Sequence, residues 1–181
     1  TNDDVLTGKW SPRFAPNEAI KYIDSLEKDG NFPHVIWPEH CLIGTKGASF
    51  VDSVMLPIKQ WCKTNASFYQ VVAKGTYPLT EHFGAFRANV PVQGRPETQL
   101  NMGLIKTLEE YENVYVSGQA KSHCVANTIL QAMEFPELAK KFVILTDCMS
   151  NVTGYEHIAD KIYADAKAMG IRFSLSTDAI L

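Results

Sequence analysis

Apolar residues recur every three to four positions in five stretches of this chain, which is the spacing of one face of an α-helix. Helices are therefore predicted around residues 19–26, 50–61, 100–108, 124–133 and 158–169. Short runs rich in β-branched and aromatic residues predict strands at 68–73, 114–117, 142–146 and 171–175. Residues 1–15 are expected to be irregular, and residues 75–96, rich in glycine and proline, to form a long loop.

The alternation of strands and helices predicts an α/β fold of three layers, with helices on both faces of a mostly parallel sheet. In such sheets, ligands bind where the strands end at their carboxyl side. Lys74 follows the strand predicted at 68–73, Cys124 lies in the turn that follows 114–117, and Asp147 follows 142–146. Lys74 and Cys124 should therefore lie at the same edge of the sheet if their strands are neighbours.

Cys124 is the strongest candidate for chemistry in the chain. It lies on a turn from an apolar strand into a predicted helix, where the first N–H groups favour a thiolate and could hold an oxyanion. A lysine close to this sulfur would also favour the thiolate. The alternatives are a buried, inert cysteine at position 124 and a solvated strand end at Lys74.

Composition narrows the classes of protein. The chain has 181 residues, 45% of them hydrophobic, which suits one domain spanning 1–181. The net charge of −3 without a basic stripe argues against nucleic acid as a partner, and no apolar run is long enough for a membrane. The polar start at Thr1 does not resemble a signal peptide, and the four cysteines form no CxxC pair. We expect a cytoplasmic protein.

Four short sequence blocks stand out, namely Trp37–Cys41, with the letters WPEHC, Gly44–Ala48 (GTKGA), Val72–Gly75 (VAKG) and Gly118–Val125 (GQAKSHCV). Together they resemble the nicotinamidases, a branch of the isochorismatase-like cysteine hydrolases. The blocks keep the family's order, and the resemblance runs from about residue 10 to residue 175.

The resemblance implies a cysteine amidohydrolase of NAD metabolism. It would convert nicotinamide, or a related small carboxamide, to the acid and ammonia through a thioester. Cys124 is similar to the nucleophile of the family and Lys74 to its catalytic lysine. The backbone N–H groups of Ala120 and Cys124 match the oxyanion hole, and the Gln119–Ala120 bond matches a cis peptide.

The same resemblance implies a substrate pocket and a metal. Trp37, Phe83 and His123 match positions that line the pocket, and His40 matches one ligand of a divalent metal, expected to be zinc. From the residues alone, His40 is an ordinary loop histidine, and Trp37 and Phe83 are ordinary core residues. Glu81 is expected either to add a contact near the site or to lie at a solvated loop tip.

Two blocks of the family have no counterpart in this sequence. They are the strand that carries the catalytic aspartate and the Asp-x-His metal pair that ends the next strand. Asp147 matches a structural aspartate instead. We therefore expect this chain to be the C-terminal part of a larger hydrolase domain, with the central N-terminal strands and the remaining metal ligands in a missing segment or a second chain. Alone it should be inactive. A homo-oligomer is also expected.

Other functions stay open at this point. The leading alternative is a catalytically inactive binding or scaffold protein that keeps the isochorismatase fold. A vinyl-ether hydrolase of the isochorismatase type is a further possibility, although such enzymes lack the Trp37–Cys41 block. Residues 81–86 depart from the usual family pattern, so the substrate could be an amide other than nicotinamide.

Overall fold

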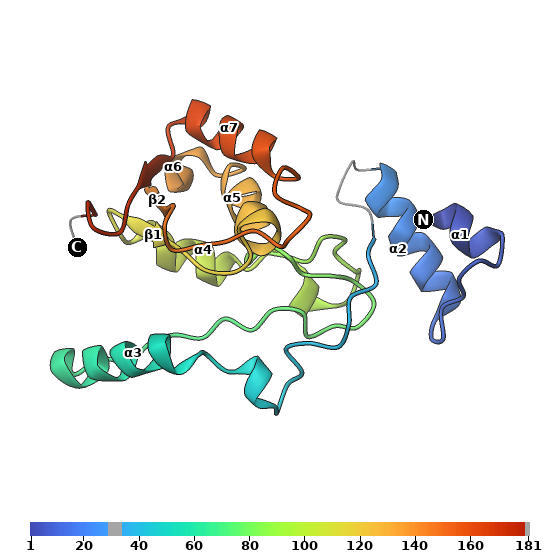
Figure 1. Cartoon of the computed structure of the whole chain (residues 1–181), viewed down its shortest axis with the longest axis horizontal. Coiled ribbons are helices and arrows are strands. Elements are labelled where there is room, and N and C mark those ends of the chain that lie inside the picture. Colours follow the sequence, from blue (N-terminus) through green and yellow to red (C-terminus); the bar gives the residue numbers. More distant parts are fainter. Residues whose placement is uncertain (29–33, 180–181) are drawn as a thin grey trace.

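The structure is a computed structural model that describes residues 1–28 and 34–179 (Figure 1). The helices are α1 (Asn2–Leu6), α2 (Pro16–Lys28), α3 (Asp52–Asn65), α4 (Met102–Glu109), α5 (Ala126–Ala132), α6 (Pro136–Ala139) and α7 (Asp160–Met169). The strands are β1 (Val114–Val116), β2 (Phe142–Leu145) and β3 (Arg172–Ser174). Short 3₁₀ turns lie at Lys46–Ala48 and Pro96–Thr98, and a π-helical turn spans Lys121–Val125.

The three strands form a small parallel sheet in the order β1-β2-β3. Ile144 occupies its centre, opposite Val116 on β1 and Phe173 on β3. β2 is buried at its first three positions, which explains why its sequence reads as a continuous apolar run. The predicted α/β class with a parallel sheet is therefore confirmed.

Helices α4 to α7 gather around this sheet and close the main core (Figure 1). α5 contributes Ile129 and Ala132, α4 contributes Ile105, and α7 contributes Ala166, all essentially inaccessible to water. Tertiary packing of these apolar faces stabilises the short helices, which would be marginal in isolation.

Hydrogen bonds from side chains of α5 hold the loop that follows position 81, most of them from Gln131, while Thr128 accepts from the Ala85 N–H at 3.1 Å. Gln131 accepts hydrogen bonds from the backbone N–H groups of Phe86 (3.0 Å) and Arg87 (3.3 Å), and it donates one to the Arg87 carbonyl (3.0 Å). Gly84 passes so close that an added Cβ would lie 2.2 Å from Gln131 Oε1. The long loop is therefore ordered over this stretch.

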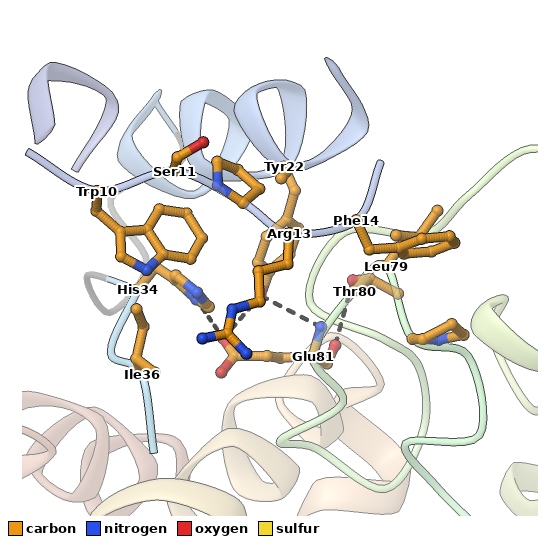
Figure 2. Close-up of a pocket in the computed structure, with 13 residues that line it drawn as sticks. Trp10, Ser11, Arg13, Phe14, Tyr22, His34, Ile36, Leu79, Thr80 and Glu81 are labelled. Atoms are coloured by element: carbon orange, nitrogen blue, oxygen red, sulfur yellow. Dashed lines mark hydrogen bonds and ion pairs between the residues drawn. The ribbon is translucent and has the colours of Figure 1, made fainter. Parts of the chain in front are cut away.

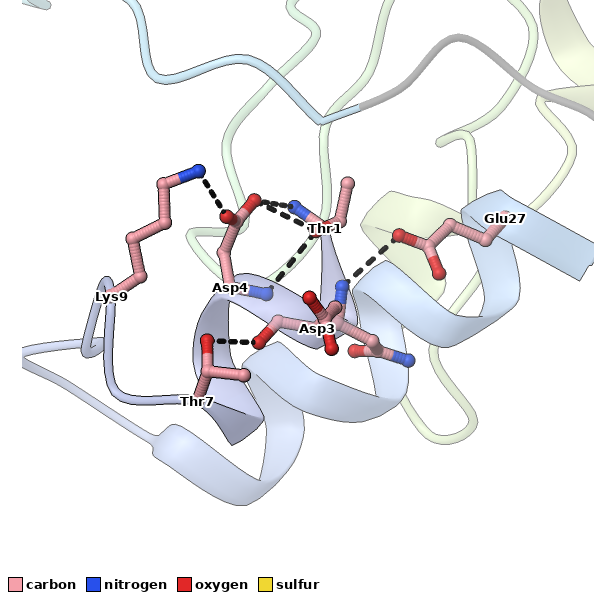
Figure 3. Close-up of polar contacts among 7 residues, drawn as sticks. Thr1, Asp3, Asp4, Thr7, Lys9 and Glu27 are labelled. Atoms are coloured by element: carbon pink, nitrogen blue, oxygen red, sulfur yellow. Dashed lines mark hydrogen bonds and ion pairs between the residues drawn. The ribbon is translucent and has the colours of Figure 1, made fainter.

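The expectation that residues 1–15 are irregular was wrong at its start. The Thr1 hydroxyl accepts from the Asp4 backbone N–H at 3.2 Å, and the Asp4 carboxylate accepts from the Thr1 backbone nitrogen at 3.0 Å, which together form a capping box for α1 (Figure 3). Lys9 pairs with the same carboxylate at 2.6 Å, and the Asn2 N–H donates to Glu27 on α2 at 3.1 Å. These contacts hold α1 against α2.

Helix α2 forms as its periodicity predicts, and it buries Tyr22, Ile23 and Leu26 in a second, smaller core. Helix α3 also forms as predicted, although no residue of α3 is buried. Figure 1 shows α3 extending away from the sheet.

The prediction of a strand at 68–73 was wrong for the described residues. The segment has no regular secondary structure, and its side chains are exposed, Phe68 by 90% and Val71 by 65%. A strand requires a hydrogen-bonded neighbour, and no described segment pairs with this one. The pattern of residues was suited to a strand, but its partner is not among the described residues.

None of the helices in the described part of the chain combines the length and apolar character that crossing a bilayer requires.

Candidate functional site

The turn that follows β1 is held by the loop that follows β2. Gly118 donates its N–H to the Cys148 carbonyl at 3.1 Å, and Lys121 donates to the Ser150 carbonyl at 2.8 Å. Gly118 has φ +124°, a backbone conformation that suits glycine. The Gln119–Ala120 peptide bond is cis, as expected. The carboxyl ends of β1 and β2 thus come together, as they must in a parallel sheet.

Cys124 lies in the π-helical turn Lys121–Val125, which continues into α5. Its neighbours Ser122 and His123 are buried, while Cys124 itself is half-buried. Such turns often occur at functional sites. The predicted helix therefore starts with a π turn that orients the cysteine, and Thr128 fixes the turn by donating to the Cys124 carbonyl at 2.8 Å.

Lys74 Nζ lies 3.5 Å from Cys124 Sγ and also donates to the His82 carbonyl at 2.8 Å. The two residues thus lie close together, as we expected, even though the segment before Lys74 does not pair as a strand. An ammonium group at this distance attracts negative charge on the sulfur. The His82 carbonyl holds the ammonium in place.

Among the described residues, four rings form an aromatic cluster beside Cys124, namely those of Trp37, Phe83, His123 and Tyr155. The His123 ring centroid lies 5.5 Å from that of Trp37, 5.9 Å from that of Phe83 and 5.2 Å from that of Tyr155. Trp37 and Tyr155 are also in contact, at 5.7 Å. The three pocket residues expected from the sequence are therefore together, joined by a fourth.

His123 is the polar member of this cluster. Burial lowers the pKa of its imidazole, with a smaller opposing effect from Glu81, so the ring is held neutral at neutral pH. Its Nδ1 lies 2.9 Å from the Ser122 hydroxyl, and that hydroxyl accepts from the Val152 N–H at 3.0 Å. The hydroxyl ties the ring to the loop after β2.

Glu81 does not lie at a solvated loop tip. Tyr22 of α2 donates its hydroxyl to Glu81 Oε2 at 2.7 Å, and His34 Nδ1 lies 3.6 Å from the same oxygen. Burial, reinforced by the Glu81 charge, raises the pKa of the Tyr22 phenol. At the next position, burial and then Lys74 lower the pKa of the His82 imidazole.

His40 is exposed, and its Nδ1 lies 2.7 Å from the Pro38 carbonyl. An Nδ1–H donated to that carbonyl leaves Nε2 as the atom that could bind a metal. Among residues 1–28 and 34–179, however, no three His, Cys, Asp or Glu side chains come together as a metal site would require. The described residues therefore do not complete the expected zinc centre.

The Asp147 carboxylate forms hydrogen bonds that connect strands of the sheet. It accepts hydrogen bonds from the Ser176 N–H at 2.8 Å and the Ser176 hydroxyl at 2.6 Å, which together lower the pKa of its carboxyl group. These bonds connect the ends of β2 and β3. The structural role expected for Asp147 agrees with this position.

Sequence reasoning missed two contributors to the site. Tyr155 lies in a loop without a motif, and only its ring contacts reveal it. The His82 carbonyl that binds Lys74 could not have been found, because a backbone acceptor leaves no sequence signal.

Comparison with known sequences finds nicotinamidases. The nicotinamidase of Saccharomyces cerevisiae is 27% identical over 181 aligned residues, which cover 92% of this chain and 76% of that protein. The nicotinamidase of Acinetobacter baylyi is 27% identical over 151 residues, covering 80% of this chain and 62% of that protein. No family model matches the chain.

Comparison with solved structures finds the same kind of protein. The structure of the yeast nicotinamidase superimposes with a TM-score of 0.53 at 25% identity, and the match covers 77% of this chain. This chain spans 58% of that structure. Sequence and structure comparisons therefore converge on the same relative.

Proposed function

We propose that this chain, a distant homologue of the nicotinamidases with an isochorismatase-like α/β fold, carries the nucleophilic half of a cysteine amidohydrolase. The substrate would be nicotinamide or another small carboxamide on a flat ring. The observation that carries the proposal is the 3.5 Å contact between Lys74 Nζ and Cys124 Sγ at the mouth of a turn.

The proposed reaction passes through a thioester. The Cys124 thiolate adds to the carboxamide carbon, and the carbonyl electron pair moves to oxygen, where the N–H groups of Ala120 and Cys124 would stabilise the charge. The carbonyl then re-forms as the C–N bond breaks, and the nitrogen takes a proton and leaves as ammonia. Water next attacks the thioester, releasing the carboxylic acid and restoring the thiol.

The aromatic cluster supports a flat substrate. Trp37, Phe83 and His123 would stack on or border the ring, and each aromatic contact contributes about 1 kcal/mol. A neutral His123 suits this role, because a charged imidazole would be costly to bury against an apolar ring.

The proposed reaction also needs groups that the described residues do not supply. A carboxylate must accept and return protons near the sulfur, and a divalent metal held partly by His40 would need further ligands. Since the described residues do not assemble a metal site, no step of the proposed reaction is assigned to a metal.

We propose that the missing carboxylate and metal ligands lie on further strands that pair with the free edge of the sheet. β1 has one hydrogen-bonded neighbour among the described strands, while the apolar segment 68–73 is exposed and pairs with no described strand. Further strands, from this polypeptide or a second chain, would pair with β1 and with this segment and complete a three-layer domain. They would carry the carboxylate and the remaining ligands.

Alkylation tests the proposed nucleophile. We expect iodoacetamide at pH 7 to label Cys124 well before Cys41, Cys62 and Cys148, because a thiolate reacts and a thiol does not. Nicotinaldehyde should protect Cys124 selectively, since a thiolate adds reversibly to an aldehyde. Peptide mass spectrometry at timed intervals measures both effects. Equal, slow labelling of all four cysteines would instead support a scaffold protein.

The proposed dependence on further strands predicts that the isolated 181-residue chain releases no ammonia from nicotinamide, even while Cys124 reacts with iodoacetamide. An ammonia assay with coupled detection checks this, with an active nicotinamidase as the positive control. Turnover by the isolated chain would show that its own residues suffice for the proton transfers.

A further inference from the structure

A cavity is lined by residues that lie outside the group around Cys124 and Lys74. Its volume is about 580 Å³, a size typical of small-molecule sites. The lining residues come from three segments (Figure 2). These are the loop before α2 together with α2 itself, the segment with His34 and Ile36, and the 78–81 loop. Neither Cys124 nor Lys74 lines this cavity, so it is distinct from the site described above.

The walls of this cavity are mostly apolar and partly aromatic. Trp10 and Phe14 come from the loop before α2, and Ile36 and Leu79 lie on the other segments. Phe14 is 69% exposed and Ile36 is 62% exposed, although both are strongly apolar. A flat ring placed between these side chains would cover them and gain from contact with the indole.

Among the polar side chains that line the cavity, Arg13 is a hydrogen-bond donor and Glu81 an acceptor. Figure 2 shows Arg13 reaching into the cavity from the loop before α2, and Glu81 lying on its floor. The contacts of the Glu81 carboxylate with Tyr22 (2.7 Å) and His34 (3.6 Å) both involve Oε2. Within the described part of the chain, Arg13 forms no ion pair, and Oε1 of Glu81 accepts no hydrogen bond. The cavity therefore offers a strong donor and an acceptor.

We propose that this cavity binds an aromatic primary carboxamide. The amide C=O accepts from the Arg13 guanidinium, the amide N–H donates to Glu81 Oε1, and the ring lies between Trp10 and the apolar wall. The corresponding carboxylic acid binds much more weakly, because its carboxylate has no hydrogen to donate and would lie beside the Glu81 charge. The inference does not depend on hydrolysis at Cys124.

The position of the cavity links it to Lys74. Glu81 is adjacent to His82, whose carbonyl accepts the Lys74 hydrogen bond, and the Glu81 N–H donates to the Tyr22 hydroxyl at 3.3 Å. A ligand that moves Glu81 would therefore also move the acceptor that holds Lys74.

Indole signals allow each site to be observed separately. The chain has three tryptophans, of which Trp10 lines this cavity and Trp37 belongs to the aromatic cluster. We would titrate a ¹⁵N-labelled Cys124→Ala chain, which cannot consume an amide, with benzamide, nicotinamide, benzoate and nicotinate, and assign the signals with Trp10→Phe and Trp37→Phe. Both amides should shift the Trp10 signal in a saturable manner, and both acids should leave it nearly unchanged.

Arg13→Gln should weaken amide binding at Trp10 by roughly tenfold to a hundredfold, the usual effect of losing one charge-assisted hydrogen bond. Lys21→Gln is the matched control, because Lys21 is exposed on α2 and does not line the cavity, and it should bind as the parent does. The proposal is overturned if only Trp37 responds to the amides, if the acids bind equally well, or if Arg13→Gln leaves the affinity unchanged. The comparison of amide with acid in the parent chain stands even if Arg13→Gln does not fold.

Discussion

Lys74→Met should slow the alkylation of Cys124 at pH 7 by roughly tenfold, because it removes a positive charge that, within about 4–6 Å, attracts the negative charge of the attacking sulfur. The Nζ–Sγ distance of 3.5 Å lies inside this range, and Lys74 is exposed, so solvent keeps the expected effect at the lower end. Iodoacetamide kinetics followed by peptide mass spectrometry give the rate at each cysteine.

Two further variants separate charge from structure in this experiment. Lys74→Arg keeps a cation near the sulfur and should lose much less of the rate. Lys121→Met removes a positive charge from the same turn, but its Nζ lies over the Tyr163 ring, at 5.4 Å from the ring centroid, so its loss should have little effect. If Lys74→Met labels as fast as the parent chain, the ammonium does not activate the thiol and the amidase proposal loses its main support.

Ile144→Ala should destabilise the chain by about 2–5 kcal/mol, the usual result of truncating a fully buried aliphatic side chain. Ile144 has no accessible surface and lies at the centre of the sheet between Val116 and Phe173, so the cavity cannot fill by local collapse. Urea unfolding followed by circular dichroism measures the change in midpoint. Ile144→Val, which removes one methylene, should cost about 0.5–1.5 kcal/mol and keeps the transition measurable.

Phe68→Ala is the matched control for this prediction. Phe68 is larger than Ile144 but 90% exposed, so its truncation should change the free energy of unfolding by less than about 0.5 kcal/mol. A loss as large as that of Ile144→Ala would mean that segment 68–73 is packed in solution. In an assembly with the further strands proposed above, the same substitution should become costly, since the side chain would then be buried.

The sequence predicted an element correctly where neighbouring residues determine that element, and failed where contacts with distant residues do. Periodicity correctly predicted the positions of all three strands and of helices α2, α3, α4 and α7. The apolar face of a helix and the apolar run of a buried strand can both be recognised from a short stretch of sequence. α1 was missed, since a capping box of Thr1 and Asp4 and contacts with α2 stabilise a helix too short to show a period. The prediction of a strand at 68–73 failed because, unlike β1, β2 and β3, this segment has no hydrogen-bonded partner among the described residues.

The same distinction applies to the candidate site. The motif around Cys124 is contiguous, so the cysteine and the cis peptide before it could be expected from the sequence. Tyr155 and the His82 carbonyl could not be predicted from the sequence. Each lies in a loop without a recognisable motif, and each contacts the site only through the tertiary fold.

What the sequence determined by itself is the α/β class, the nucleophile turn and the family likeness, since each depends on neighbouring residues or on the order of short blocks. Only the tertiary structure decided that Lys74 reaches Cys124, that the His123 ring contacts those of Trp37, Phe83 and Tyr155, and that Arg13 and Glu81 line the same cavity. These outcomes depend on contacts between residues as much as 118 positions apart, such as that between Trp37 and Tyr155. Their distances depend on how the whole chain packs, which no local pattern specifies.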